Sequence, residues 1–232
     1  MNKKIIRAID GGYGWFKFTR DVKDNGEIET YTFPSIATIA TDKNQGGDFL
    51  KDRRTINVMH KNVLYEVGVD AILNADGHSK KVLNSNYIES NEYAALMKGA
   101  LKLMNLGQID LLVLGTPVMN YDKTKGLLKK NWTGNIELDG ENCVLIKQVK
   151  VYPQPLGGLA YSFKESGQKQ EYMYQRNLII DPGYYTLDWL ITQDMKIAKG
   201  SGSYQGGMYF YMKAIVVDLV NKMDKHPLIR LN

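Results

Sequence analysis

The chain has 232 residues, of which 44% are hydrophobic and 24% are charged, the balance of an ordinary globular protein with ample length for a core. Its net charge of +5 is spread over separate pairs of basic residues, which argues against a concentrated nucleic-acid-binding patch. The single Cys143 excludes an internal disulfide, and we expect it to be buried in a strand. No apolar run reaches the length of a membrane span, so we expect a cytoplasmic protein.

The N-terminal region predicts three strands in succession. Apolar residues over 4–9 and 15–19 flank a glycine-rich turn, and a third strand over 27–33 follows the turn at 24–26. Strands joined by such short turns form an antiparallel meander, which we place at one side of a mixed sheet.

The first turn carries a candidate binding motif. Asp10 ends the first strand, and Gly11, Gly12 and Gly14 follow it closely. Glycines at this density permit positive φ angles and let a ligand approach the backbone. Lys17 is the third residue after the turn, within reach of a phosphate bound there.

A polar middle section follows. Within 41–86, short apolar runs over 55–59 and 63–67 predict a hairpin, whereas the stretches on either side of it are polar. We interpret this section as a small appendage outside the central sheet.

The next segment changes to helical spacing. Ser90 can cap a helix whose apolar face is formed by residues within 93–104, and Gly107 can terminate it. The apolar run over 109–114 then predicts one buried strand. It ends in the turn 115–117, at the edge of the sheet where α/β proteins bind ligands.

Further elements lead to and past Gln154. They are, in order, a helix over 122–130, a hairpin formed by strands 135–138 and 142–151, and a helix over 159–164. Pro153 and Pro155 hold Gln154 in an extended segment between the hairpin and the second helix. We interpret the polar stretch 165–176 as a linker.

The second half of the chain repeats the first motif. Ile180-Asp181-Pro182-Gly183-Tyr184 shares the pattern Ile-Asp-x-Gly-Tyr with Ile9-Asp10-Gly11-Gly12-Tyr13, and each copy lies between two apolar strands. A single Asp-Gly turn usually only reverses the chain, but its recurrence with matching flanks indicates a duplicated fold. Two such tips facing each other would form a clamp, with amides for phosphate oxygens and two aspartates for a magnesium ion.

The remaining sequence extends this second unit. It predicts a short strand over 195–198, a flexible turn over 200–203 and a helix that opens at 205–207. Apolar residues between 215 and 223 give this helix an apolar stripe.

Four segments, in this order, resemble the motifs of the actin-like ATPases, and within them those of the plasmid-partition proteins of the ParM or StbA type. They are 9–17 for the first phosphate motif, 112–117 with 121–122 for the strand and turn before the connecting helix, 147–158 for the interdomain connector, and 179–188 for the second phosphate motif. The resemblance implies an α/β, actin-like (ribonuclease H-like) fold of duplicated mixed five-stranded sheets with flanking helices, the second domain incomplete.

The same resemblance implies two domains. Residues 1–165 would form domain I, with a small insertion subdomain at about 41–86, and residues 166–232 the N-terminal part of domain II. The family's adenine-binding segment would lie beyond Asn232, so the resemblance implies a C-terminally truncated chain.

The site implied by the resemblance holds ATP, or GTP, with Mg²⁺. Asp10 and Asp181 would hold the metal, and Gln154 and Asp181 would be catalytic by orienting the attacking water. The nucleotide-binding residues would be Asp10, Gly11, Gly12, Tyr13, Gly14, Lys17, Gly183, Tyr184, Tyr185 and Thr186.

Two residue positions leave alternatives open. Tyr184 and Tyr185 stand where family members usually have small residues, so their bulk either crowds the γ-phosphate or points into the core. Asp188 either makes a structural hydrogen bond inside the hairpin or contacts the metal.

The function implied is a slow ATP hydrolase that polymerises head-to-tail into filaments with ATP and magnesium for plasmid DNA segregation. Its partners would be copies of itself and an adaptor protein bound to plasmid DNA, so that contact with DNA is indirect and no membrane is involved. Two alternatives remain: a truncated, non-hydrolysing actin-like subunit, and a small-molecule kinase of the same superfamily.

Overall fold

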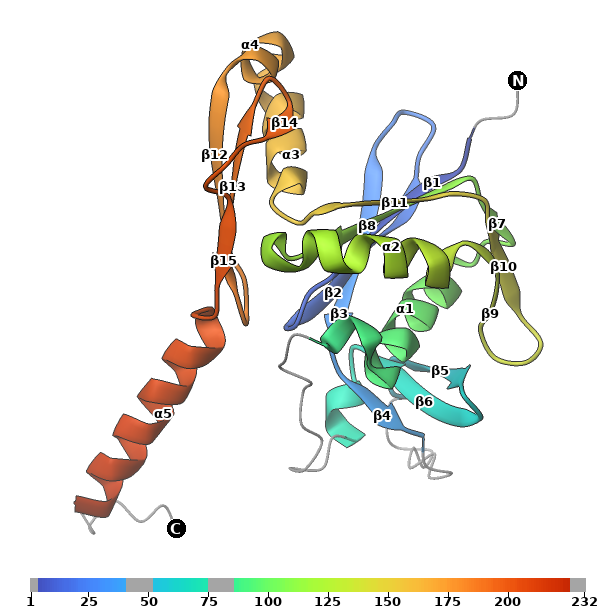
Figure 1. The fold of residues 1–232 in the computed structure, drawn as a ribbon. Coiled ribbons are helices and arrows are strands. Elements are labelled where there is room, and N and C mark those ends of the chain that lie inside the picture. The colour runs from blue at the N-terminus through green and yellow to red at the C-terminus, as the bar shows by residue number, and fades with distance from the viewer. Residues whose placement is uncertain (1–3, 41–51, 75–85, 226–232) are drawn as a thin grey trace.

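The computed structural model describes residues 4–40, 52–74 and 86–225. Its largest sheet has five strands in the order β11-β8-β1-β2-β3 (Figure 1). These strands are β1 (Ile6–Gly11), β2 (Trp15–Val22), β3 (Ile28–Pro34), β8 (Leu111–Thr116) and β11 (Val149–Pro153). The pairs β1–β2 and β2–β3 are antiparallel, whereas β8 is parallel to both β1 and β11. The sheet is therefore mixed, and the predicted meander forms one side of it.

Two helices cover one face of this sheet. Helix α1 (Asn91–Met104) packs on β1 and β2, and α2 (Tyr121–Trp132) packs on β8 and β11. The Oγ of Ser90 accepts a hydrogen bond from the Tyr93 amide at 3.0 Å, which confirms the predicted cap. The predicted end at Gly107 is wrong, because Asn105 adopts the left-handed conformation that ends the helix.

A smaller sheet, in the order β4-β6-β5, packs against α1. Its strands are β4 (Ala37–Ile39), β5 (Thr55–His60) and β6 (Val63–Gly68), and the last two form the predicted hairpin. The predicted appendage at 41–86 omitted β4, and its stretches 41–51 and 75–85 lie outside the described residues. Short 3₁₀ helices η1 (Ala71–Asn74) and η2 (Tyr87–Glu89) flank the second of these stretches.

Two predicted strands are each divided in the structure. The run 109–114 forms β7 (Gln108–Ile109), which pairs with β10, and β8, which pairs with β1 and β11. Between them, the carboxylate of Asp110 accepts a hydrogen bond from the Ile5 amide at 2.8 Å and forms an ion pair with Lys147 at 2.8 Å. The run 142–151 forms β10 (Cys143–Ile146) and β11. Strand β10 joins β7 and β9 (Gly134–Glu137) in a separate sheet.

The predicted burial of Cys143 is wrong, because its side chain is exposed. It begins β10, in which exposed and buried residues alternate and only Val144 and Ile146 face the core.

Two helices follow β11: α3 (Leu156–Ser166) and α4 (Lys169–Tyr174), the latter within the stretch interpreted as a linker. An antiparallel sheet follows, in which β13 pairs with β12, β14 and β15. Its strands are β12 (Arg176–Pro182), β13 (Leu187–Gln193), β14 (Lys196–Ile197) and β15 (Gly202–Tyr204). The expected flexible turn over 200–203 is therefore partly a strand, since its backbone pairs with β13.

Helix α5 (Met208–Lys225) ends the described chain and extends away from both sheets (Figure 1). The predicted apolar stripe is present in the sequence, but Ile215, Val216, Leu219 and Val220 are all about half exposed or more. None of the helices in the described ranges is long and apolar enough to cross a membrane.

Candidate functional site

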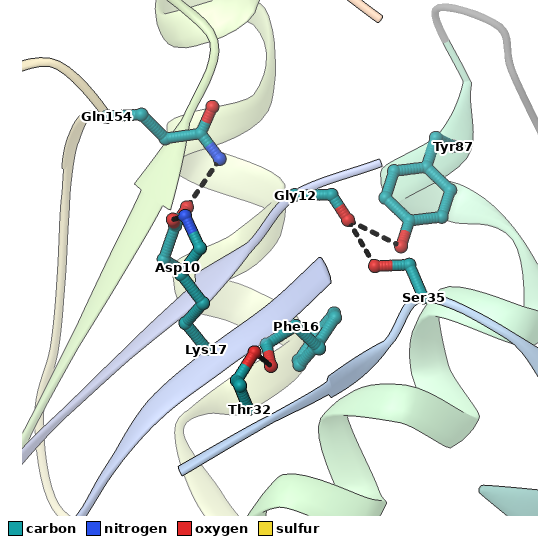
Figure 2. A network of polar contacts seen from close by, with 8 residues as sticks. All are labelled: Asp10, Gly12, Phe16, Lys17, Thr32, Ser35, Tyr87 and Gln154. Atoms are coloured by element: carbon teal, nitrogen blue, oxygen red, sulfur yellow. Dashed lines mark hydrogen bonds and ion pairs between the residues drawn. The ribbon is translucent and has the colours of Figure 1, made fainter. Parts of the chain in front are cut away.

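The first hairpin tip places a carboxylate, a cation and an amide together. Asp10 on β1 lies opposite Lys17 on β2, and its Oδ2 is 3.6 Å from the Lys17 Nζ. The Nε2 of Gln154 donates a hydrogen bond to the Asp10 Oδ1 at 2.7 Å (Figure 2). The backbone amide of Gln154 donates a hydrogen bond to the Thr116 carbonyl at 2.9 Å, which ties this segment to the end of β8.

Gly115 makes the contact between Gln154 and Asp10 possible. A Cβ at this position would lie 2.9 Å from the Gln154 Cγ and 3.4 Å from the Asp10 Oδ1. Any side chain there would displace the glutamine. The predicted turn over 115–117 begins too early, because Gly115 lies within β8, and a glycine in a buried strand is a signal of close approach.

The backbone of the first tip is fixed from the core side. The Gly12 carbonyl accepts hydrogen bonds from the Ser35 Oγ at 2.6 Å and the Tyr87 Oη at 3.3 Å (Figure 2). Gly11 is buried, and a Cβ there would lie 2.8 Å from the Tyr93 ring. Gly11 is therefore packed against the core and its role is to let α1 approach.

The second tip is a tight turn with a similar carboxylate. Asp181 on β12 lies opposite Asp188 on β13. The Gly183 amide donates to the Thr186 carbonyl at 2.9 Å, and a Cβ on Gly183 would lie 2.8 Å from that same oxygen. This turn therefore requires glycine, and the Gly183 amide points into it.

The two tips face one cavity of about 210 Å³. All the predicted site residues except Gly11 line it: Asp10, Gly12, Tyr13, Gly14, Lys17, Gln154, Asp181, Gly183, Tyr184, Tyr185 and Thr186. A second cavity of about 450 Å³ shares Asp10, Lys17, Gln154 and Asp181 and extends toward Gly157 and Gly158 at the start of α3.

The electrostatics of this space favour a bound cation. Burial raises the pKa of Asp181, and the nearby carboxylates of Asp10 and Asp188 raise it further, against the lowering effect of Lys17. A divalent cation between Asp10 and Asp181 would relieve this repulsion. Carboxylate oxygens are the ligands that Mg²⁺ prefers in proteins.

Aromatic side chains join the two tips, and we call Tyr13, Tyr184, Tyr185 and Phe210 the aromatic bridge. The Tyr185 ring lies 4.8 Å from the Tyr13 ring and 5.6 Å from the Phe210 ring, centroid to centroid. A Cβ on Gly14 would lie 2.8 Å from the Tyr184 Cβ, so the two tips touch there. Burial, followed by Tyr185 and Asp188, raises the pKa of Tyr13 to about 12.

Helix α5 is anchored on the second tip. The amides of Met208, Tyr209 and Gly207 donate to the carbonyls of Gly183, Tyr184 and Tyr185 at 3.1, 2.8 and 3.1 Å. The first amides of this helix are thereby paired with the protein's own backbone. Tyr184 and Tyr185 thus pack between the first tip and α5, and both residues line the cavity.

Residues 8–157 match the family model described as the actin-like proteins N-terminal domain, which is more than half of the chain. The chain belongs to the actin-like proteins. Its fold, a mixed α/β fold with a five-stranded mixed sheet, is the actin-like fold. No curated protein matches the sequence.

Solved structures of other actin-like proteins share this fold. The AlfA filament bound to AMPPNP is 19% identical with a TM-score of 0.67, covering 89% of this chain and 71% of that one. Ta0583, an archaeal actin homologue, is 20% identical with a TM-score of 0.69, covering 98% and 69%. A 15-stranded ParM filament from Clostridium botulinum is 21% identical with a TM-score of 0.66, covering 94% and 70%. This actin-like chain is therefore shorter than those to which it is similar.

Proposed function

We propose that this actin-like protein binds ATP or GTP with Mg²⁺ between its two acidic hairpin tips and hydrolyses it slowly as the subunit of a filament. The observation that carries the proposal is that Asp10 and Asp181, far apart in the sequence, line one cavity together with Lys17 and Gln154. The AlfA structure with AMPPNP and a structure of Ta0583 with ADP support a nucleotide as the ligand.

Asp10 and Asp181 would hold the metal, either directly or through its water ligands. Bound there, Mg²⁺ would neutralise phosphate charge. Lys17 has a largely exposed side chain beside Asp10, so its ammonium group can turn from the carboxylate to a phosphate. Gly12, Gly14 and the 183–186 turn let a phosphate chain approach the backbone of the two tips.

Gln154 and Asp181 would position the attacking water for in-line transfer. The side-chain amide of Gln154 is held at the cavity by its hydrogen bond to Asp10. A glutamine has no useful proton affinity, so it orients a water molecule without deprotonating it. Slow turnover follows, and a slow hydrolysis step suits a filament that is meant to persist before it disassembles.

We further propose that the filament segregates plasmid DNA in the cytoplasm through an adaptor protein. The support is that AlfA and ParM, to which the chain is similar, are described in filaments. The proposed division places domain I at residues 1–165, with the insertion at about 41–86 as a subunit contact, and the start of domain II at 166–232. A head-to-tail contact that does not close on itself generates such a polymer.

A second candidate is a non-hydrolysing actin-like subunit, and the aromatic bridge favours it. Tyr184 and Tyr185 line the cavity at the second tip, where the bulk of their rings would compete for space with a terminal phosphate. A chain in which they stay in place would bind a nucleoside diphosphate more readily than a triphosphate.

Calorimetry with ATP, ADP and MgCl₂, followed by sedimentation after ATP addition, tests these candidates. The filament proposal expects Mg²⁺-dependent ATP binding, a pellet that forms with ATP and disperses after hydrolysis, and no phosphate release in Asp181→Ala. Binding and hydrolysis without a pellet would favour a small-molecule kinase instead. Binding of ADP alone, or of no nucleotide, would favour the non-hydrolysing subunit, and the absence of any binding would also refute the proposed nucleotide site.

A further inference from the structure

A group of buried and partly buried polar contacts joins the second hairpin to the first half of the chain. The Val118 amide, in the 3₁₀ helix η3 (Val118–Asn120), donates to the Asp188 Oδ1 at 2.9 Å. The Met119 amide donates to the Ser203 Oγ at 3.0 Å, and the Ser203 hydroxyl donates to the same carboxylate. We call Asp188, Ser203 and these two amides the latch.

Both oxygens of the Asp188 carboxylate accept hydrogen bonds from the protein, although the residue also borders the cavity between the two tips. Its second oxygen accepts a hydrogen bond from the Thr186 Oγ1 at 2.5 Å, and the residue is only 2% exposed. A buried carboxylate is costly unless hydrogen bonds compensate its charge, and three donors do so here. Its oxygens are thereby committed to β15, η3 and the 183–186 turn.

The position of Asp188 gives these bonds their consequence. It lies directly opposite Asp181 across the β12–β13 pair, and directly opposite Ser203 across the β13–β15 pair. Opposed residues of an antiparallel pair project from the same face of the sheet. A rotation of the hairpin about the latch would therefore move Asp181 with respect to Asp10.

We propose that Asp188 is a positioning residue. Through the latch it sets the angle between the first half, which contains the five-stranded sheet, and the second half, which contains the β12–β13 sheet, and so keeps Asp181 facing Asp10. It acts by accepting hydrogen bonds and does not bind the metal. The proposal does not depend on the ligand of the cavity, because the latch consists of the protein's own groups.

Two substitutions at Asp188 separate hydrogen bonding from charge. Asp188→Ala leaves the Val118 amide and the Ser203 hydroxyl without their carboxylate acceptor. Asp188→Asn retains an oxygen for the Val118 amide and can donate its own NH₂ group to Thr186, whose hydroxyl accepts as well as donates. A latch tolerates the second change, whereas a metal-binding carboxylate does not.

The angle between the halves can be measured with two spin labels and without nucleotide. The native Cys143 is exposed in the first half, and Ile197→Cys on β14 supplies an exposed position in the second. We expect one narrow distance distribution for the labelled parent and for Asp188→Asn, and a distribution at least twofold broader for Asp188→Ala. Ser203→Ala, a smaller change, should broaden it to a lesser degree.

The matched control is Thr192→Val, a buried site on the same strand whose hydroxyl accepts a bond from the Asn177 side chain and does not reach η3. It should lower stability without broadening the distances.

An unchanged distribution in both Asp188→Ala and Ser203→Ala overturns the proposal, as does equal broadening in Asp188→Asn and Asp188→Ala. A Mg²⁺ affinity that falls in Asp188→Asn while its distances stay narrow would overturn the statement that Asp188 does not bind metal. If the parent protein binds no nucleotide, the proposed function is refuted and the latch proposal is not.

Discussion

Two units of this chain share one plan and differ in how they are packed. Strands β1, β2 and β3 with helix α1 form the first, and β12, β13 and β15 with helix α5 form the second. In the first, α1 lies on the sheet and buries Tyr93, Leu96 and Met97 completely or nearly so. In the second, α5 extends away, and only Leu190 of the apolar residues on β13 is fully buried. The first unit is thus stabilised by its own core, whereas contacts with the first half hold the second in place.

The two carboxylates of the cleft differ in the same way. Asp10 is opposed by Lys17 and accepts a hydrogen bond from Gln154. Asp181 occupies the corresponding register but is opposed by Asp188, another carboxylate. One side of the cavity therefore has its charge compensated, and the other retains negative charge for a cation to balance.

The largest test of this comparison is Phe16→Ala in the first core. Phe16 is fully buried, with its ring 5.7 Å from those of Phe33 and Tyr93. We expect a loss of about 3–5 kcal/mol in the free energy of unfolding, measured by urea denaturation. Leu178→Ala, on the exposed face of β12, should stay within about 0.5 kcal/mol of the parent. Equal losses at the two sites would contradict the assignment of the core to the first unit.

Gly14→Ala tests the contact between the tips. Its new Cβ would meet the Tyr184 Cβ at 2.8 Å, so one tip must shift. Overpacking of this kind should cost about 1–3 kcal/mol and loosen the aromatic bridge. The measurement is denaturation together with proteolysis in the 183–186 turn. Gly157→Ala, whose Cβ would enter open space at the start of α3, should be neutral or stabilising by up to about 1 kcal/mol.

Asp10→Asn and Asp181→Asn test whether the two acids serve one metal. If both hold Mg²⁺, each substitution should weaken Mg²⁺-dependent nucleotide binding by roughly 10- to 100-fold. Calorimetry in MgCl₂ and in EDTA measures this difference. The exposed Asp21, which pairs with Arg7, supplies the control: Asp21→Asn should leave nucleotide affinity unchanged. An effect at only one of the two cleft acids would show that they do not act on a shared ion.

The sequence was sufficient for the features that are repeated locally. The Ile-Asp-x-Gly-Tyr pattern predicted both hairpin tips, and the meander, the Ser90 cap and the β5–β6 hairpin followed from turn chemistry and periodicity. The family motifs predicted the fold. That the tips line one cavity was a hypothesis from the repeat, and in the structure Asp10 and Asp181 line it together.

The features that escaped prediction depend on partners distant in sequence. Strand β15 is glycine- and serine-rich and becomes a strand only because it pairs with β13. The role of Asp188 depends on η3, and the close approach at Gly115 depends on Gln154. No local pattern indicated that Cys143 would face solvent, since its strand alternates and one register decides the side.

The smallest effect concerns pH and the uncompensated side of the cavity. Because burial and the neighbouring carboxylates raise the pKa of Asp181, the folded state favours its protonated form. This contribution is fully present below the unfolded pKa of the carboxyl and is lost as the pH rises through the higher folded pKa. Removing the charge with Asp181→Asn should therefore stabilise the metal-free protein at neutral pH, by about 0.2–1 kcal/mol since the site is partly open to solvent.

The same substitution should have no such benefit near pH 3, where Asp181 is protonated in both states. Urea midpoints at the two pH values measure the difference, with the exposed Asp52→Asn as the control for the loss of one negative charge. Addition of MgCl₂ should reverse the order at neutral pH, because the cation stabilises the charged parent and has less to bind in the variant. A benefit of equal size at both pH values would mean that the side chain's packing, and not its charge, is responsible, and the difference between the two hairpins would then be one of shape alone.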